Sequence, residues 1–271
     1  MDNDDLPVGR ILSRREMLSI FGAAGAALVF GACSGDSNGS PTATQGAASN
    51  ATTGGGAAQP TSGATSAATS AATANASRTV NCVVTPELTE GPFYVDEKLD
   101  RSDIRTDSTS NRAVAGVPLV LNIGVFQASS SQCLPLAGAI VDVWQCDAAG
   151  VYSDVSGNTE DFLRGSQVTG QDGMAKFTTV YPGWYQGRAV HIHFKVRAQK
   201  DGKSYDFTSQ WFFDEALNDE VFAQAPYASR GRRTTMNAND SIFRQSGKQL
   251  TLAAVKEGAG YAAPFDIAMQ I

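Results

Sequence analysis

Residues 187–196 read Gly-Arg-Ala-Val-His-Ile-His-Phe-Lys-Val and hold both histidines of the chain. Side chains alternate between the two faces of a β-strand, so His191 and His193 would share one face while Ile192 and Phe194 take the other. The apolar face can be buried against a second layer. The opposite face offers two imidazoles, and neutral imidazole is the commonest side-chain ligand of metal ions. The stretch therefore predicts a strand that lines a metal site, and it leaves the other ligands open.

Other segments of the chain also have the patterns of strands. They are short, have alternating or β-branched apolar residues, and are separated by Gly, Pro and Asp; they are residues 117–125, 139–144, 166–169 and 174–180. The turn sequence Gly170-Gln171-Asp172-Gly173 is typical of a hairpin. The helices that we expect are brief, for instance at 214–223. These patterns predict an all-β fold, an antiparallel β-sandwich with long loops and few short helices.

The first 33 residues have the composition of an export signal. A twin arginine, Arg14-Arg15, precedes an apolar run over 17–32 that is too short for a comfortable membrane span. The run ends in Leu28-Val29-Phe30-Gly31-Ala32-Cys33, which resembles a lipobox with Phe30 where leucine is usual. We therefore expect 1–33 to be a twin-arginine-type signal. Lipidation of Cys33 and simple cleavage of the signal both stay open.

Residues 34–79 are expected to be a disordered tether. From Ser34 to Ser77 there is no Val, Leu, Ile, Met or aromatic residue, and Asp36 is the only charge. Such a segment cannot bury enough apolar surface to offset the entropy of ordering. The globular domain is then 80–271. This organisation predicts an exported protein of the cell envelope or periplasm, which touches the membrane only through a lipid anchor.

Charge and cysteine content narrow the function classes further. The net charge is −6 and no basic stretch stands out, which argues against a nucleic-acid surface. Disulfides can persist in an exported protein, and Cys82, Cys133 and Cys146 allow one intramolecular bridge with three pairings. The sequence does not choose among them, and it does not decide whether the protein is a homo-oligomer.

Two tyrosines lie where a metal site could recruit them. Tyr152 follows a strand and a glycine turn, and Tyr185 lies on the loop that leads into the histidine strand. A phenol is a poor ligand until a strongly Lewis-acidic cation removes its proton. A hard trivalent ion such as Fe(3+) suits two phenolates and two imidazoles, whereas zinc favours cysteine, histidine and carboxylate.

Three motifs together resemble those of the intradiol ring-cleavage dioxygenases. They are Thr89-Glu90-Gly91-Pro92-Phe93-Tyr94, Val141-Asp142-Val143-Trp144-Gln145 with Gly150-Val151-Tyr152-Ser153, and Pro182-Gly183-Trp184-Tyr185 with Arg188, His191 and His193-Phe194. The resemblance extends from about Cys82 to the C-terminal region. It is nearer to the protocatechuate 3,4-dioxygenase type and its exported relatives than to catechol 1,2-dioxygenases, which add an N-terminal helical segment for dimerisation.

The resemblance implies a function and a set of site residues. The Fe(3+) ligands would be Tyr152, Tyr185, His191 and His193, with the Pro-Gly-x-Tyr spacing favouring Tyr185 over Tyr181. Arg188 would stabilise negative charge on the substrate, Gln210 would orient a ligand or substrate, and Tyr94 would lie in the substrate region. The family opens a small aromatic diol with O2 between its hydroxylated carbons to a cis,cis-muconate, and it needs no other cofactor.

Two other function classes compete with this one. A cupin-like metalloenzyme with Fe(II) or zinc would also use a His-x-His strand, but it requires a carboxylate and a third histidine, and the chain has only two histidines. A non-catalytic envelope module would be a β-sandwich that binds a partner or sugar and retains a relic metal site. The colour of ferric tyrosinate and oxygen uptake with catechols distinguish these hypotheses.

Overall fold

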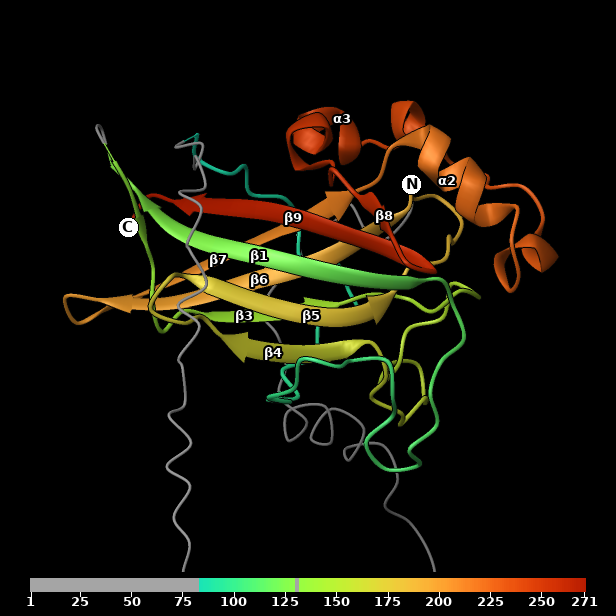
Figure 1. Ribbon diagram of the computed structural model, residues 1–271, viewed down its shortest axis with the longest axis horizontal. Helices are drawn as coiled ribbons and strands as arrows, with labels where there is room; N and C mark the ends of the chain where they lie inside the picture. The colour runs from blue at the N-terminus through green and yellow to red at the C-terminus, as the bar shows by residue number, and fades with distance from the viewer. Residues whose placement is uncertain (1–82, 130–131) are drawn as a thin grey trace, which may run out of the picture. The chain divides into compact units, whose positions relative to one another are not determined.

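The computed structural model describes residues 83–129 and 132–271 (Figure 1). The expected signal at 1–33 with Cys33, and the expected tether at 34–79, lie outside the described residues. The described part folds as two β-sheets with short helices, and Figure 1 shows α2 and α3 gathered beyond one end of the strands. The predicted all-β sandwich with few short helices is confirmed.

The first sheet has five strands. They are β1 (Pro118–Ala128), β2 (Cys133–Pro135), β5 (Met174–Val180), β8 (Val255–Glu257) and β9 (Gly260–Met269). β2 and β5 pair with β1 along one edge, β9 pairs with its other edge, and β8 follows β9. The β1–β9 pair is parallel, whereas the sequence predicted antiparallel pairing. β9 reaches β1 after a long helical excursion and not through a hairpin, so either direction is accessible to it.

The second sheet carries the histidine strand. Its order is β4-β3-β6-β7, with every neighbour antiparallel, and its strands are β3 (Ile140–Trp144), β4 (Arg164–Val168), β6 (His191–Lys200) and β7 (Lys203–Phe212). Ile192, Phe194 and Val196 on β6 are fully buried in the core between the sheets, as the alternation predicts. Just before the strand, the Ala189 N–H donates to Asp240 at 2.7 Å.

The helical segments come mainly from residues 215–250. They are α2 (Glu215–Phe222), α3 (Phe243–Ser246) and the 3₁₀ turns η2 (Tyr227–Arg230), η3 (Asn237–Asn239) and η4 (Gly247–Leu250). Asp214 caps α2 by accepting from the Ala216 N–H at 2.8 Å, which agrees with the helix expected at 214–223. In the described part of the chain, no helix has the length and apolar character needed to cross a membrane.

Two of the cysteines lie in the described part of the chain. Cys133 is disulfide-bonded, and Cys146 is a free, buried thiol. The two pairings that include Cys146, among the three that the sequence allowed, are therefore excluded.

Candidate metal centre

The site lies on the face of β6 that points away from the core. His193 is directly opposite Trp144 on β3 and Gln210 on β7. The Trp144 ring stacks on the His193 ring, with centroids 5.0 Å apart and an interplanar angle of 10°. Gly91 adds a third wall, because a Cβ there would lie 3.2 Å from His193 Cε1 and its φ of +71° favours glycine. Both histidines are almost fully buried, at 2% and 1% exposure.

Three of the four expected ligands bring their donor atoms together. The Nε2 atoms of His191 and His193 are 3.0 Å apart, and the Tyr185 hydroxyl oxygen lies 3.1 Å from His191 Nε2. Two nitrogens bound to one ion at about 2.1 Å and at a right angle would be about 3.0 Å apart. The spacing therefore fits two adjacent ligands of one metal ion.

The environment of the histidines keeps both imidazoles neutral. His191 Nδ1–H donates to the Ala189 carbonyl at 2.7 Å, which leaves the Nε2 lone pair for a ligand. Burial, with the positive charge of Arg188, lowers the pKa of His191 to about 3. Burial and the neighbouring His191 lower the pKa of His193 well below its ordinary value. Neutral nitrogen is the form that binds metal.

Tyr152 brings a second phenol to the same cluster. It lies on the loop between β3 and β4, its ring stacks on Phe93 with centroids 4.4 Å apart, and its ring centroid is 5.8 Å from that of Tyr185. Burial, and then the neighbouring Tyr185, raise the pKa of Tyr152 well above its ordinary value. Its hydroxyl is buried, and the polar group that interacts with it is the Tyr185 phenol. A metal ion would give each of these two phenol oxygens a stronger partner than the other phenol.

Arg164 fixes the backbone next to Tyr152. It is almost fully buried and donates to the Ser153 carbonyl through Nε and Nη2, at 3.2 and 2.6 Å. Its Nη1 donates to the Phe93 carbonyl at 2.8 Å. One guanidinium therefore ties the Tyr152 loop to the Gly-Pro-Phe-Tyr segment that packs on the Tyr152 ring.

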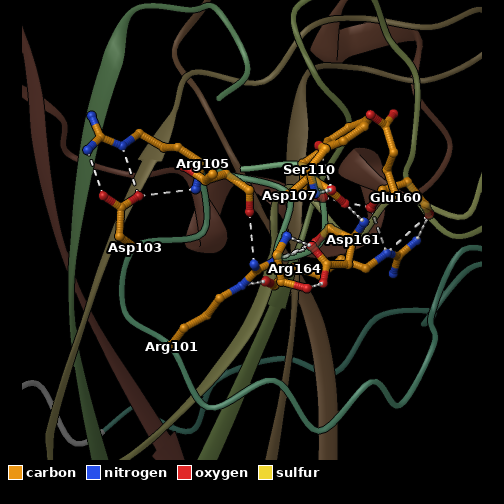
Figure 2. Close-up of polar contacts among 12 residues, drawn as sticks. Arg101, Asp103, Arg105, Asp107, Ser110, Glu160, Asp161 and Arg164 are labelled. Atoms are coloured by element: carbon orange, nitrogen blue, oxygen red, sulfur yellow. Dashed lines mark hydrogen bonds and ion pairs between the residues drawn. The ribbon is translucent and has the colours of Figure 1, made fainter. Parts of the chain in front are cut away.

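A wider polar network holds Arg164 and its loop in place (Figure 2). Arg101 donates to the Arg164 carbonyl at 2.9 Å and to Asp161, and the buried Asp107 accepts from Asp161 N–H at 2.9 Å and from Ser110. These contacts join residues 101–110 to residues 161–164. The network explains how a long loop can present Tyr152 in one position.

Arg188 is buried beside the histidines, at 3% exposure. Its Nε donates to Asp240 Oδ2 at 3.0 Å and its Nη2 donates to Gln210 Oε1 at 2.5 Å. Gln210 Nε2 in turn donates to the Thr89 carbonyl at 2.8 Å. The third nitrogen, Nη1, is buried with no hydrogen-bond partner among the described residues. Arg188 and Gln210 therefore lie together beside the site, with one guanidinium nitrogen left for another group.

Tyr94 and Tyr181 do not join the donor cluster. The Tyr94 ring packs against Trp144 with centroids 4.9 Å apart and lies under the Lys195 ammonium, 4.4 Å from its centroid. Burial raises the pKa of Tyr94 well above its ordinary value, so it is a neutral phenol. Tyr181 lies in the core, where its hydroxyl donates to Asn218 Oδ1 at 2.8 Å. The geometry thus separates Tyr181 from Tyr185.

Within the described residues, no three His, Cys, Asp or Glu side chains gather as a metal site. The donors that the cupin-like hypothesis requires are therefore not brought together there. Sequence reasoning missed two residues that support the site, Arg164 and Asp240. Neither lies in one of the motifs above. Each reaches the site through hydrogen bonds that form only in the folded chain, Arg164 to Ser153 and Phe93, and Asp240 to Arg188.

Comparisons with known proteins identify relatives of the chain. A family model described as "Dioxygenase" matches residues 89–253. The structure is similar to an intradiol ring-cleavage dioxygenase from Tetranychus urticae, with 28% identity and a TM-score of 0.62, covering 70% of this chain and 95% of that one. The dioxygenase domain of a carbohydrate-binding fusion protein from Streptomyces sp. SirexAA-E is 31% identical, with a TM-score of 0.52, and the match covers 70% and 99% of the two chains.

Curated relatives match over shorter shares of their length. Catechol 1,2-dioxygenase 1 of Acinetobacter lwoffii is 30% identical over 208 residues, which is 64% of this chain and 63% of the relative. A chlorocatechol 1,2-dioxygenase of Pseudomonas putida is 28% identical over 145 residues, or 46% and 52% of the two chains. The chain thus spans between 52% and 63% of the length of these two relatives.

Proposed function

Since the chain belongs to the intradiol ring-cleavage dioxygenase family, we propose that it is an Fe(3+)-dependent enzyme that opens catechol-type rings between the two hydroxylated carbons. Both atoms of O2 enter the product, a cis,cis-muconate-type dicarboxylate, so the electrons balance without an external reductant. The observation that carries the proposal is the convergence of the Tyr185 oxygen with the two histidine Nε2 atoms. The names of the curated relatives support a catechol as the substrate class.

The proposed iron ligands are two phenols and two neutral imidazoles, from Tyr152, Tyr185, His191 and His193. When bound, the ferric ion supplies a Lewis acid that lowers the pKa of the phenols and of the two catechol hydroxyls. Of the two phenols, Tyr185 is partly exposed and Tyr152 is buried. The Tyr185 oxygen is the better placed of the two to take a proton from an incoming catechol hydroxyl, as a general base.

Arg188 stabilises the negative charge that develops on the substrate. Its Nε and Nη2 are held by Asp240 and Gln210, and its buried Nη1 has no partner within the described ranges. A fixed N–H donor in a site shielded from water stabilises developing negative charge far better than a mobile or solvated one. Gln210 orients this guanidinium, and Tyr94 lies in the substrate region next to Trp144, not on the metal.

The test uses the full chain, purified and loaded with ferric iron. It should be coloured by phenolate-to-iron charge transfer, and it should consume one O2 per ring with catechol, a chlorocatechol, protocatechuate or hydroxyquinol. The product should absorb as a cis,cis-muconate. A colourless iron-loaded protein would contradict the tyrosinate site. Coloured protein that consumes no O2 with any of these diols would favour the non-catalytic envelope module.

We also propose that the protein is exported and anchored at Cys33, outside the described residues. The twin arginine, the apolar run and the lipobox-like end support this proposal. In a bacterial host with a twin-arginine system, the chain should fractionate with membranes, and Cys33→Ser should move it to the soluble periplasm. Replacing Arg14 and Arg15 together by lysine should keep it in the cytoplasm. Equal fractionation of all three proteins would overturn the proposal.

A further inference from the structure

We propose that Asp240 is a positioning residue of the site, which sets the direction of the Arg188 guanidinium and holds the backbone that leads into His191. This inference rests on the proposed function, because the value of a fixed Arg188 lies in the charge that it stabilises. Asp240 lies between η3 and α3, 40 residues beyond the end of β6 at Lys200, and outside every motif of the sequence.

Both oxygens of the Asp240 carboxylate are occupied by donors. Oδ2 accepts from Arg188 Nε at 3.0 Å and from the Ala189 N–H at 2.7 Å. Oδ1 accepts from the backbone N–H groups of Ile242 and Phe243, at 2.7 and 3.0 Å. The residue is fully buried. A carboxylate with four donors in fixed directions cannot rotate without losing at least two hydrogen bonds.

The charge state of Asp240 suits this role. Burial alone would raise the pKa of its carboxyl, but the Arg188 guanidinium and the backbone N–H groups of Ala189 and Phe243 lower it overall. The pKa of Arg188 is raised, because the negative charges of an ionised Tyr185 and of Asp240 outweigh the effect of burial. The pair is therefore a charged, buried ion pair in which the carboxylate lone pairs are satisfied and Arg188 Nη1 has no partner among the described residues.

One branch of the contacts fixes the unpaired nitrogen of Arg188. A guanidinium is planar, so holding Nε on Asp240 and Nη2 on Gln210 determines where Nη1 points. Nη1 is the nitrogen that lacks a partner in the described part of the protein. Without Asp240, rotation about the side-chain bonds would no longer be restrained at Nε.

The other branch reaches the metal ligand itself. Asp240 holds the Ala189 N–H, and the carbonyl of the same residue accepts from His191 Nδ1 at 2.7 Å. The side chains of Ala189, Phe212 and Ile242 pack in one small apolar cluster, which keeps the Asp240 segment against the start of β6. One carboxylate thus positions both the proposed charge stabiliser and the backbone acceptor of a ligand histidine.

The first test is Asp240→Asn in the iron-loaded full chain. We expect the charge-transfer colour to remain, KM for the catechol to change little, and kcat to fall by about 10- to 100-fold, the range for partners that orient groups in metal sites. The matched control is Glu215→Gln. Like Asp240, the Glu215 carboxylate accepts from an arginine and from a backbone N–H, those of Arg233 and Asn237. The control substitution should lower the melting temperature and leave kcat within twofold of wild type.

A double-mutant comparison separates positioning from general stability. In an Arg188→Lys background the planar guanidinium is absent, so adding Asp240→Asn should reduce kcat by a smaller factor than it does in wild type, because only the branch through Ala189 is left to lose. Equal reductions in the wild-type and the Arg188→Lys backgrounds would overturn the proposal. If Asp240→Asn does not fold, Asp240→Ser carries the same test, since a serine hydroxyl can still accept from the Ile242 N–H.

A measurement that does not depend on turnover keeps the two proposals distinguishable. Hydrogen–deuterium exchange of the full chain should show the amides of Ala189, Ile242 and Phe243 protected in wild type and exchanging faster in Asp240→Asn. Unchanged exchange would contradict the role of Asp240 even if the enzyme is active. If the wild-type protein consumes no O2 but Asp240→Asn still exchanges these amides faster than wild type, the positioning contacts are supported and the proposed function is overturned.

Discussion

Tyr185→Phe should remove most of the colour of the iron-loaded protein and lower kcat by about 10²- to 10⁴-fold, the range for losing a general base. The substitution removes one proposed phenolate ligand, whose oxygen lies 3.1 Å from His191 Nε2, and keeps the ring that packs against Phe93. Absorbance, iron content and oxygen uptake measure the three consequences separately. The fold should survive, because the phenol oxygen is not part of the core between the sheets.

Tyr181→Phe is the matched control for this change. It deletes the same atom from a tyrosine four residues away, but there the hydroxyl donates to Asn218 Oδ1 in the core. Leaving that acceptor unsatisfied should cost about 1–3 kcal/mol of the free energy of unfolding. Colour and kcat should stay at wild-type levels. If Tyr181→Phe bleached the protein and Tyr185→Phe did not, the ligand would be assigned to the wrong tyrosine.

Arg188→Lys should lower kcat by about 10²- to 10³-fold, the usual loss when one donor to a developing oxyanion is removed. Lysine retains a positive charge beside the buried Asp240, whereas alanine would leave that carboxylate unpaired at a cost of about 3–5 kcal/mol. Lysine cannot reproduce the planar fork that holds Asp240 and Gln210 together. Iron content and colour should therefore persist while oxygen uptake falls.

The control for this substitution is Arg233→Lys. Arg233 pairs with Glu215 and Asp219 on α2, so the same change there tests only the loss of a guanidinium. Its turnover should stay within about twofold of wild type, while the melting temperature should fall, because the Arg233 side chain is almost fully buried between its two carboxylate partners. Loss of iron from Arg188→Lys, with unchanged kcat per bound iron, would make the role of Arg188 structural.

Local pattern predicted β1, β3, β4, β5 and the face of β6 that carries the site, but it did not predict β2, β7, β8 or β9. The alternation of apolar residues around His191 and His193 depends only on strand geometry, and β6 follows it. The two tyrosines expected as ligands were singled out through motifs, and the structure brings Tyr185 next to His191 while Tyr152 packs against Phe93 in the same cluster. These features depend on neighbours that are close in sequence, or on residue types that the chemistry requires.

Long-range contacts account for what the sequence did not reveal. Asp240 and Arg164 contact the site through bonds to Arg188, Ser153 and Phe93, over separations of 52, 11 and 71 residues. The parallel pairing of β1 with β9 joins the first and the last strand of the described chain. Periodicity carries no information about which distant segment will pair, because that is settled by packing of the whole domain.

The position of β9 between β1 and β8 has a consequence for synthesis in the cell. The first sheet cannot be completed until residues 260–269 have emerged from the ribosome, since β9, which pairs with both β1 and β8, is synthesised after the other strands of the sheet. Contacts between such distant segments slow folding, because a large loop must be ordered before they form. Nascent chains would therefore wait, with β1 lacking its neighbour on one edge, in a window during which chaperones could hold them.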